Sequence, residues 1–62
     1  MSNYEVTFEV FTDNSTKPRE ELKINTEAGN KKLAVIRAMQ AINKMDGYSK
    51  LYKNVKKVEV LS

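Results

Sequence analysis

The residues best suited to chemistry lie near the end of the chain, where tyrosines and lysines are interleaved. Aromatic rings can stack on nucleotide bases while ammonium groups meet phosphates, so this composition predicts a non-specific, salt-sensitive nucleic-acid surface. Lysine dominates and arginine is nearly absent, which argues against bidentate reading of base edges. In the alternative interpretation, Leu51 and Tyr52 close the core and the lysines only keep the loop soluble. The residues of this predicted surface are Lys44, Tyr48, Lys50, Tyr52, Lys53, Lys56 and Lys57.

The common catalytic groups are missing from the sequence. It contains no histidine and no cysteine, which excludes Ser-His-Asp and Cys-His arrangements and thiolate zinc sites. Glu20 and Glu21 are neighbours on a predicted strand, so they point to opposite faces and cannot form a carboxylate pair. Asp13-Asn14-Ser15 resembles a calcium loop only faintly, because the spacing and the closing glutamate are absent. We therefore expect a protein that is not an enzyme and has no metal, cofactor or small-molecule substrate.

Length and composition indicate one small globular domain over residues 1–62. The chain is 40% hydrophobic and 31% charged, as in folded rather than disordered proteins. A core of this size gives a few kcal/mol of net stability at most, so dimerisation would help. No apolar run approaches the roughly 18 residues of a membrane span, and Met1–Tyr4 does not begin a signal peptide. We expect a cytoplasmic protein with no membrane partner.

The net charge of +3 conceals an asymmetry along the chain. Residues 1–30 hold six acidic and three basic side chains, a net charge of −3. Residues 31–62 hold two acidic and eight basic side chains, a net charge of +6. The second half can therefore attract an acidic partner that the first half would repel.

Hydrophobic periodicity predicts three strands and one helix. Strict alternation over Tyr4–Thr12 indicates a half-buried strand, and a second follows at Glu20–Thr26. The turn-forming residues of Asp13–Pro18 join the two into a hairpin. A helix is predicted over Lys31–Met45, and a third strand over Val55–Leu61 with Val58 and Val60 directed inward.

The predicted helix has recognisable ends and one apolar stripe. Asn30 is suited to the N-cap, with Thr26 as a competing cap one turn earlier. Gly47 is suited to the left-handed conformation that stops a helix. The residues of the stripe that should face the sheet are Ala34, Val35, Ala38, Ala41, Ile42 and Met45, with Met39 at its edge.

These elements predict an α+β fold of the ββαβ type. If the third strand lies beside the first, the three-stranded antiparallel sheet has the order 2-1-3, with the helix on one face. The other face then meets water. Glu5 and Glu9 belong to this open face, together with Phe11 and Leu61.

Two large aliphatic side chains, Leu33 and Ile36, fall among polar residues on the outward side of the predicted helix. Together with Arg37 and Gln40 they form a predicted contact surface for a protein partner or a second copy of the chain. Two alternatives remain open: the helix is rotated slightly, or the loop folds over these residues.

The arrangement resembles a class of small accessory proteins. Tyr4-Glu5-Val6-Thr7-Phe8-Glu9-Val10, a second strand ending Ile24-Asn25-Thr26-Glu27-Ala28, an alanine-rich helix and a closing Val58-Glu59-Val60 carry the resemblance. Such proteins occur in phages, prophages and conjugative elements of low-GC Gram-positive bacteria, to which the Lys/Asn-rich composition is also similar. The resemblance implies a small protein that binds and modulates a larger host or phage protein, but it has no diagnostic motif and assigns no residue a role.

Overall fold

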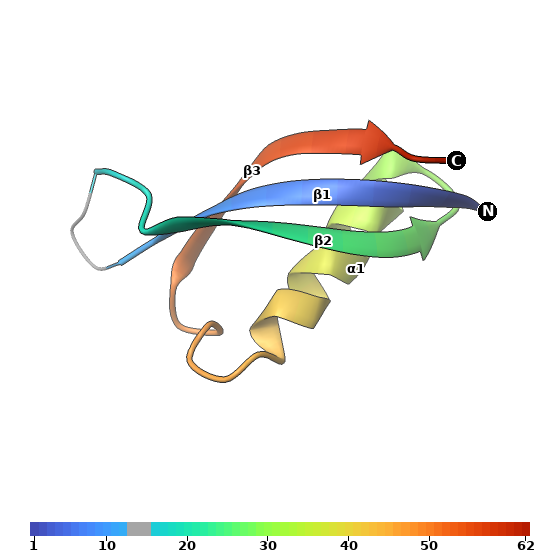
Figure 1. Ribbon diagram of the computed structural model, residues 1–62. Coiled ribbons are helices and arrows are strands. Elements are labelled where there is room, and N and C mark those ends of the chain that lie inside the picture. The colour runs from blue at the N-terminus through green and yellow to red at the C-terminus, as the bar shows by residue number, and fades with distance from the viewer. Residues whose placement is uncertain (13–15) are drawn as a thin grey trace.

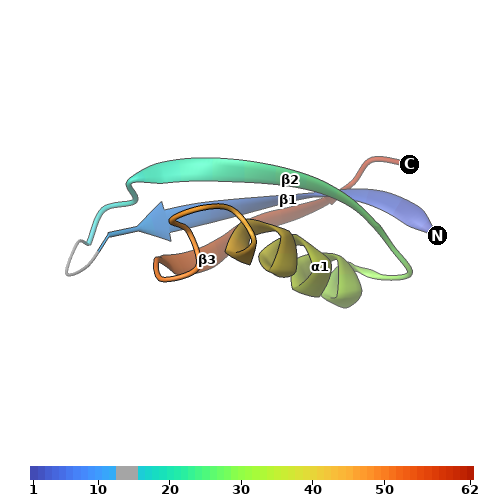
Figure 2. The same cartoon turned by 90° about the horizontal axis from the view of Figure 1, so that it is seen from below.

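Strand β1 (Ser2–Phe11) occupies the centre of the computed structural model, which describes residues 1–12 and 16–62. Strands β2 (Glu20–Ala28) and β3 (Tyr52–Val60) flank it on either side, and both run antiparallel to it (Figure 1). Helix α1 (Lys31–Asn43) covers one face of this sheet (Figure 2). The α+β ββαβ architecture with strand order 2-1-3 is therefore confirmed.

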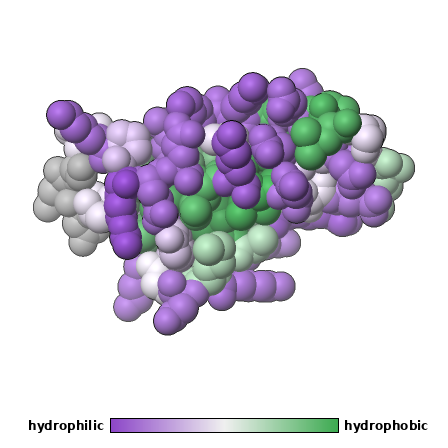
Figure 3. Space-filling view, in the orientation of Figure 1, coloured by the Kyte–Doolittle hydropathy of each residue, from purple (hydrophilic) through white to green (hydrophobic). Residues whose placement is uncertain are grey.

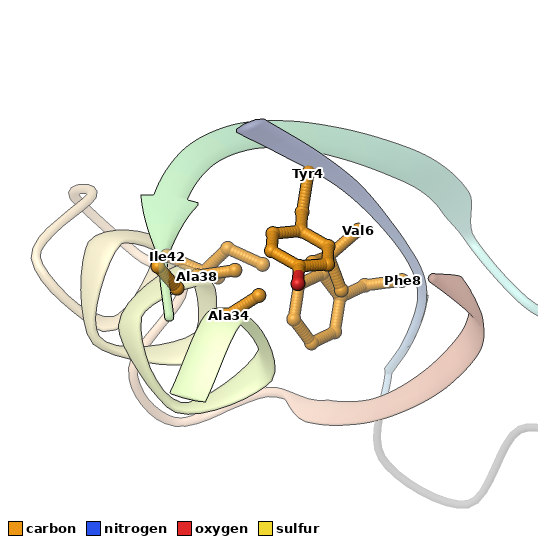
Figure 4. Packing of buried hydrophobic residues seen from close by; sticks show 7 residues of the cluster. Tyr4, Val6, Phe8, Ala34, Ala38 and Ile42 are labelled. Carbon is orange, nitrogen blue, oxygen red and sulfur yellow. The ribbon is translucent and has the colours of Figure 1, made fainter. Parts of the chain in front are cut away.

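The core lies between β1 and α1. Alternate residues of β1, Tyr4, Val6, Phe8 and Val10, are buried on the helix side of the sheet. The first three form one cluster with Ala34, Ala38 and Ile42, which are fully buried on one face of α1 (Figure 4). The two alanines let the helix approach the sheet closely, and burying each large β1 side chain contributes roughly 1.5–3 kcal/mol.

The start of α1 is as predicted and its end is not. The Asn30 side-chain oxygen accepts a hydrogen bond of 2.9 Å from the Leu33 N–H, which confirms Asn30 as the N-cap. The competing cap, Thr26, belongs to β2 instead. The helix ends at Asn43, two residues early, so Met45 lies beyond it and is 38% exposed rather than part of the buried stripe. Ala41, also assigned to that stripe, is exposed.

Gly47 lies in the turn that follows α1, where its φ of 82° places it in the left-handed region. A glycine is favoured there because a Cβ atom would clash with the following carbonyl. The prediction of a left-handed glycine is confirmed, although it lies in the turn rather than directly at the end of the helix.

Strand β3 begins at Tyr52, three residues before the predicted start at Val55, and it ends at Val60 rather than Leu61. Its pairing with β1 is irregular: Thr7 faces Lys57 and Phe8 faces Val55, which leaves Lys56 as an extra residue. Val60, predicted to point inward, faces Tyr4 but is 51% exposed. The reason is that α1 packs mainly against β2 and β1 and covers β3 less.

The last two residues continue along β1, since the Leu61 N–H donates to the Asn3 carbonyl at 2.7 Å. The predicted turn at Asp13–Pro18 and the faint calcium-loop resemblance include residues 13–15, which lie outside the described residues. Among the described residues, α1 is too short and too polar to cross a membrane.

Candidate interaction surface

The outward side of α1 brings together the four residues that the sequence predicted as a contact surface. Ala34, Ala38 and Ile42 define the inward side; Leu33, Ile36 and Gln40 lie on the opposite side, and Arg37 lies at the flank next to β2. Leu33 and Ile36 remain 43% and 45% exposed. We call this group the outer helix surface: Leu33, Ile36, Arg37 and Gln40, all of them exposed.

Part of the outer helix surface rests on the connection between β2 and α1. The Leu33 Cδ1 atom lies 4.0 Å from the position that a Cβ atom on Gly29 would take. The Arg37 guanidinium donates a hydrogen bond of 3.2 Å to the Glu27 carbonyl. The connection therefore covers one side of Leu33, while the end of β2 holds Arg37, and more than two fifths of Leu33 remains exposed.

The surroundings of the outer helix surface are basic. The helix contains Lys31, Lys32 and Arg37 but no acidic residue, and Lys44 follows it directly. Lys31, Lys32 and Lys44 are all exposed. A partner that covers Leu33 and Ile36 would therefore meet positive charge around them.

The open face of the sheet has the opposite charge. Odd-numbered positions of β1 and β2 project from it, as do the outward residues of β3. Three lysines on this face oppose five glutamates, so acidic groups are in excess. The acidic residues are Glu5, Glu9, Glu21, Glu27 and Glu59, and the basic ones are Lys23, Lys56 and Lys57.

Two ion pairs lie on this open face, one between β3 and β2 and one along β3. The Lys56 ammonium lies 2.5 Å from the Glu21 carboxylate, and the Lys57 ammonium lies 3.4 Å from that of Glu59. The hydrogen bond and charge of Lys56 lower the pKa of Glu21, and the same contact raises the pKa of Lys56. A shallow hollow over Thr7 lies between these pairs. Both pairs are well exposed to solvent, so each contributes little to stability.

Figure 3 shows the mixture of residue types on one side of the molecule. Hydrophilic residues cover most of it, with hydrophobic residues gathered in the middle and near the C-terminal end of the chain (Figure 3). Val60 and Leu61, at that end, are 51% and 49% exposed. They provide aliphatic groups with an exposure like that of Leu33 and Ile36, but at the end of β3 and not on the helix.

The tyrosines of the predicted nucleic-acid surface lie in different environments. The Tyr48 ring packs against the core, and its hydroxyl donates a hydrogen bond of 2.6 Å to the Glu20 carboxylate. This hydrogen bond, together with partial burial, raises the pKa of Tyr48. Tyr52 is exposed on the open face of the sheet, where its ring centre lies 5.7 Å from that of Phe11. The rings of Tyr48 and Tyr52 therefore do not form one stacking platform.

The lysines of this predicted surface are also dispersed. Lys53 faces Val10 on the helix side of the sheet, and its ammonium donates to the Asn43 side chain at 2.8 Å and to the Tyr48 carbonyl at 2.6 Å. Lys56 and Lys57 are paired with glutamates on the other face, as described above. Lys44 and Lys50 are exposed in or beside the turn after α1. The structure thus spreads the seven residues over two faces.

Two features of these surfaces were missed in the sequence. One is the Lys53 ammonium, which joins the end of α1 to the following turn. The other is the separation of charge by face, for which a signal was available: α1 lacks acidic residues while the outward strand positions are rich in glutamate. Among the described residues, no group of three or more Asp and Glu side chains is placed to hold a metal ion.

Comparison with known proteins adds no assignment, because no family model, curated protein or solved structure matches the chain.

Proposed function

We propose that this protein is a non-enzymatic, cytoplasmic protein-interaction module that binds a larger protein, or a second copy of itself, through the outer helix surface. The observation that carries this proposal is the exposure of Leu33 and Ile36 on the side of α1 opposite the core. Paired aliphatic groups on a rigid helix can serve as anchors for a partner. A role as modulator or inhibitor of the larger protein accords with the small size of the domain.

The size of the expected effect follows from the exposed area. More than half of Leu33 and of Ile36 is already covered, so a partner that buries the rest gains about 1 kcal/mol from each. Loss of both would weaken association by about 30-fold, since 1.4 kcal/mol corresponds to a factor of ten.

The test is an affinity pull-down from a plausible host lysate with wild-type protein and the variant Leu33→Ser/Ile36→Ser. The matched control is Val60→Ser/Leu61→Ser, which removes two similarly exposed aliphatic side chains at the end of β3. Circular dichroism establishes that each variant is folded. We expect the helix variant to lose the captured protein and the β3 variant to retain it.

Two outcomes would contradict the proposal. If Leu33→Ser/Ile36→Ser unfolds the domain, the two residues belong to the core. If capture disappears on nuclease treatment but survives the helix variant, the partner is a nucleic acid, and binding should weaken steeply between roughly 50 and 200 mM salt.

A further inference from the structure

The outer edge of β2 is an open row of backbone groups. In antiparallel pairing, consecutive residues direct their N–H and C=O groups to alternate sides of the strand. The Asn3 carbonyl accepts from the Leu61 N–H on the β3 side. The backbone N–H and C=O groups of odd-numbered β1 residues therefore point toward β3, and those of even-numbered residues point toward β2. The Val10 carbonyl accordingly accepts from the Arg19 N–H on the β2 side, at 2.6 Å.

This alternation determines which groups of β2 remain available. Thr26 faces Tyr4, and Ile24 faces Val6, so the even-numbered residues of β2 bond to β1. The odd-numbered residues, Lys23, Asn25 and Glu27 among them, direct their backbone groups away from the sheet. The hydrogen bond from Arg37 to the Glu27 carbonyl agrees with this orientation. That carbonyl has a second lone pair and can accept a further bond.

We propose that two copies of this chain pair antiparallel along β2, with Asn25 facing Asn25 of the second copy across a two-fold axis. The result is a continuous six-stranded sheet with both helices on the same face. This interface lies along the edge of β2 and shares only the hydrogen bond from Arg37 to Glu27 with the outer helix surface, so it forms whether or not Leu33 and Ile36 bind a partner.

The charges along β2 favour this register over its neighbours. A two-fold axis at Lys23 would place Lys23 opposite Lys23 of the second copy. An axis at Ile24 would place Glu21 opposite Glu27 of the second copy, and Glu27 opposite its Glu21. An axis at Leu22 or Thr26 leaves only five residues of β2 paired. With the axis at Asn25, most residues of β2 pair with β2 of the second copy. Lys23 then faces Glu27 of the second copy, and Glu27 faces its Lys23.

The side chains in this register are complementary on both faces. On the open face, the two Asn25 amides can exchange hydrogen bonds between the Lys23–Glu27 pairs. On the helix side, Ile24 lies opposite Thr26 of the second copy, and Leu22 lies opposite Ala28. Leu22 and Ile24 are only partly buried in the single chain, so pairing covers more of their apolar surface.

The other edge of the sheet is less suited to this pairing. Strand β3 is interrupted by the extra residue Lys56, and bulges and lysines are devices that keep edge strands apart. Strand β2 pairs with β1 over nine residues without such an irregularity. It also lies on the side of the sheet that α1 covers more fully.

Cysteine cross-linking tests the register directly, because the chain contains no cysteine of its own. Residues that exchange hydrogen bonds across an antiparallel pair have Cα atoms about 5.5 Å apart, within disulfide range. We expect Asn25→Cys to form a covalent dimer under mild oxidation at least tenfold faster than Lys57→Cys, an exposed control on β3. Equal rates for the two variants would overturn the proposal.

Charge reversal provides a second, independent test, with the mass in solution measured by sedimentation over a range of concentrations. Each of the single variants, Lys23→Glu and Glu27→Lys, replaces both Lys23–Glu27 pairs across the interface by pairs of like charge. Each should raise the dimer dissociation constant about tenfold. The double variant Lys23→Glu/Glu27→Lys restores both pairs and should restore the dimer. Lys57→Glu, the same change on β3, should have no effect.

Failure of this proposal is distinguishable from failure of the proposed function. A monomer at millimolar concentration, or a dimer that Leu33→Ser/Ile36→Ser dissociates while Asn25→Cys does not cross-link, overturns pairing along β2. The capture of a partner through the outer helix surface is measured separately in the pull-down and depends on neither result.

Discussion

Asn30 sets the start of α1 through one side-chain hydrogen bond to the Leu33 N–H. Replacing it with alanine leaves that donor without its partner, and we expect the free energy of unfolding to fall by about 1 kcal/mol in urea denaturation. Asn30→Asp puts a carboxylate oxygen in place of the amide oxygen, so it keeps an acceptor there and should lose little. Equal losses for both variants would mean that the cap contributes through some other contact.

Tyr48 offers a residue-scale test of electrostatics. The hydrogen bond to Glu20 raises its pKa, so the folded state favours the neutral phenol. The stability from this bond is fully present below the ordinary tyrosine pKa and is lost as the pH rises through the raised value of the folded state. We expect Glu20→Ala to lower the pKa of Tyr48 in an NMR titration, with Tyr48→Phe used to assign the signal. An unchanged pKa would contradict the hydrogen bond.

At the scale of elements, Lys53 connects the end of α1 to the start of β3. Its ammonium donates to the Asn43 side chain and the Tyr48 carbonyl, and so holds the intervening turn. Lys53→Met keeps the apolar stem and removes these bonds. We expect amide exchange at Tyr48 and Leu51 to accelerate about tenfold, since a net hydrogen bond contributes about 1 kcal/mol or slightly more. Lys50→Met, in the same turn, is the control and should leave exchange unchanged.

The elements differ in how well the sequence predicts them. The alternation in β1 is regular because one face of it is buried throughout. In β3 the extra residue Lys56 separates the inward positions Val55 and Val58 by three residues instead of two, which conceals the start of the strand. The outer helix surface follows from helical spacing alone, whereas the contacts of Lys53 depend on the tertiary position of the turn. Local patterns cannot reveal such a contact.

At the scale of the whole molecule, a single core supports all four elements. Phe8 lies at its centre with no exposed surface. Phe8→Ala removes about 3–5 kcal/mol, comparable with the entire stability expected of so small a domain. We expect that variant to be unfolded by circular dichroism at 25 °C, whereas Phe8→Leu stays folded with a lower midpoint of thermal unfolding. A folded Phe8→Ala protein would show that association adds stability beyond this core.

The two layers of the molecule also differ in charge. The helix layer is basic and the open sheet face is acidic, so an approaching acidic partner is oriented toward the helix before contact. This arrangement places the outer helix surface on the attractive side.

The order β2-β1-β3 has a consequence for how the protein is made. The ribosome completes β1 and β2 first, and they can pair as a hairpin while the rest of the chain is still being synthesised. One edge of β1 stays open until residues 52–60 emerge, and its buried side chains lack their full cover until α1 docks. Folding to completion therefore waits until β3 has been synthesised, and a chain cut short before β3 would expose an apolar strand edge that is prone to aggregate.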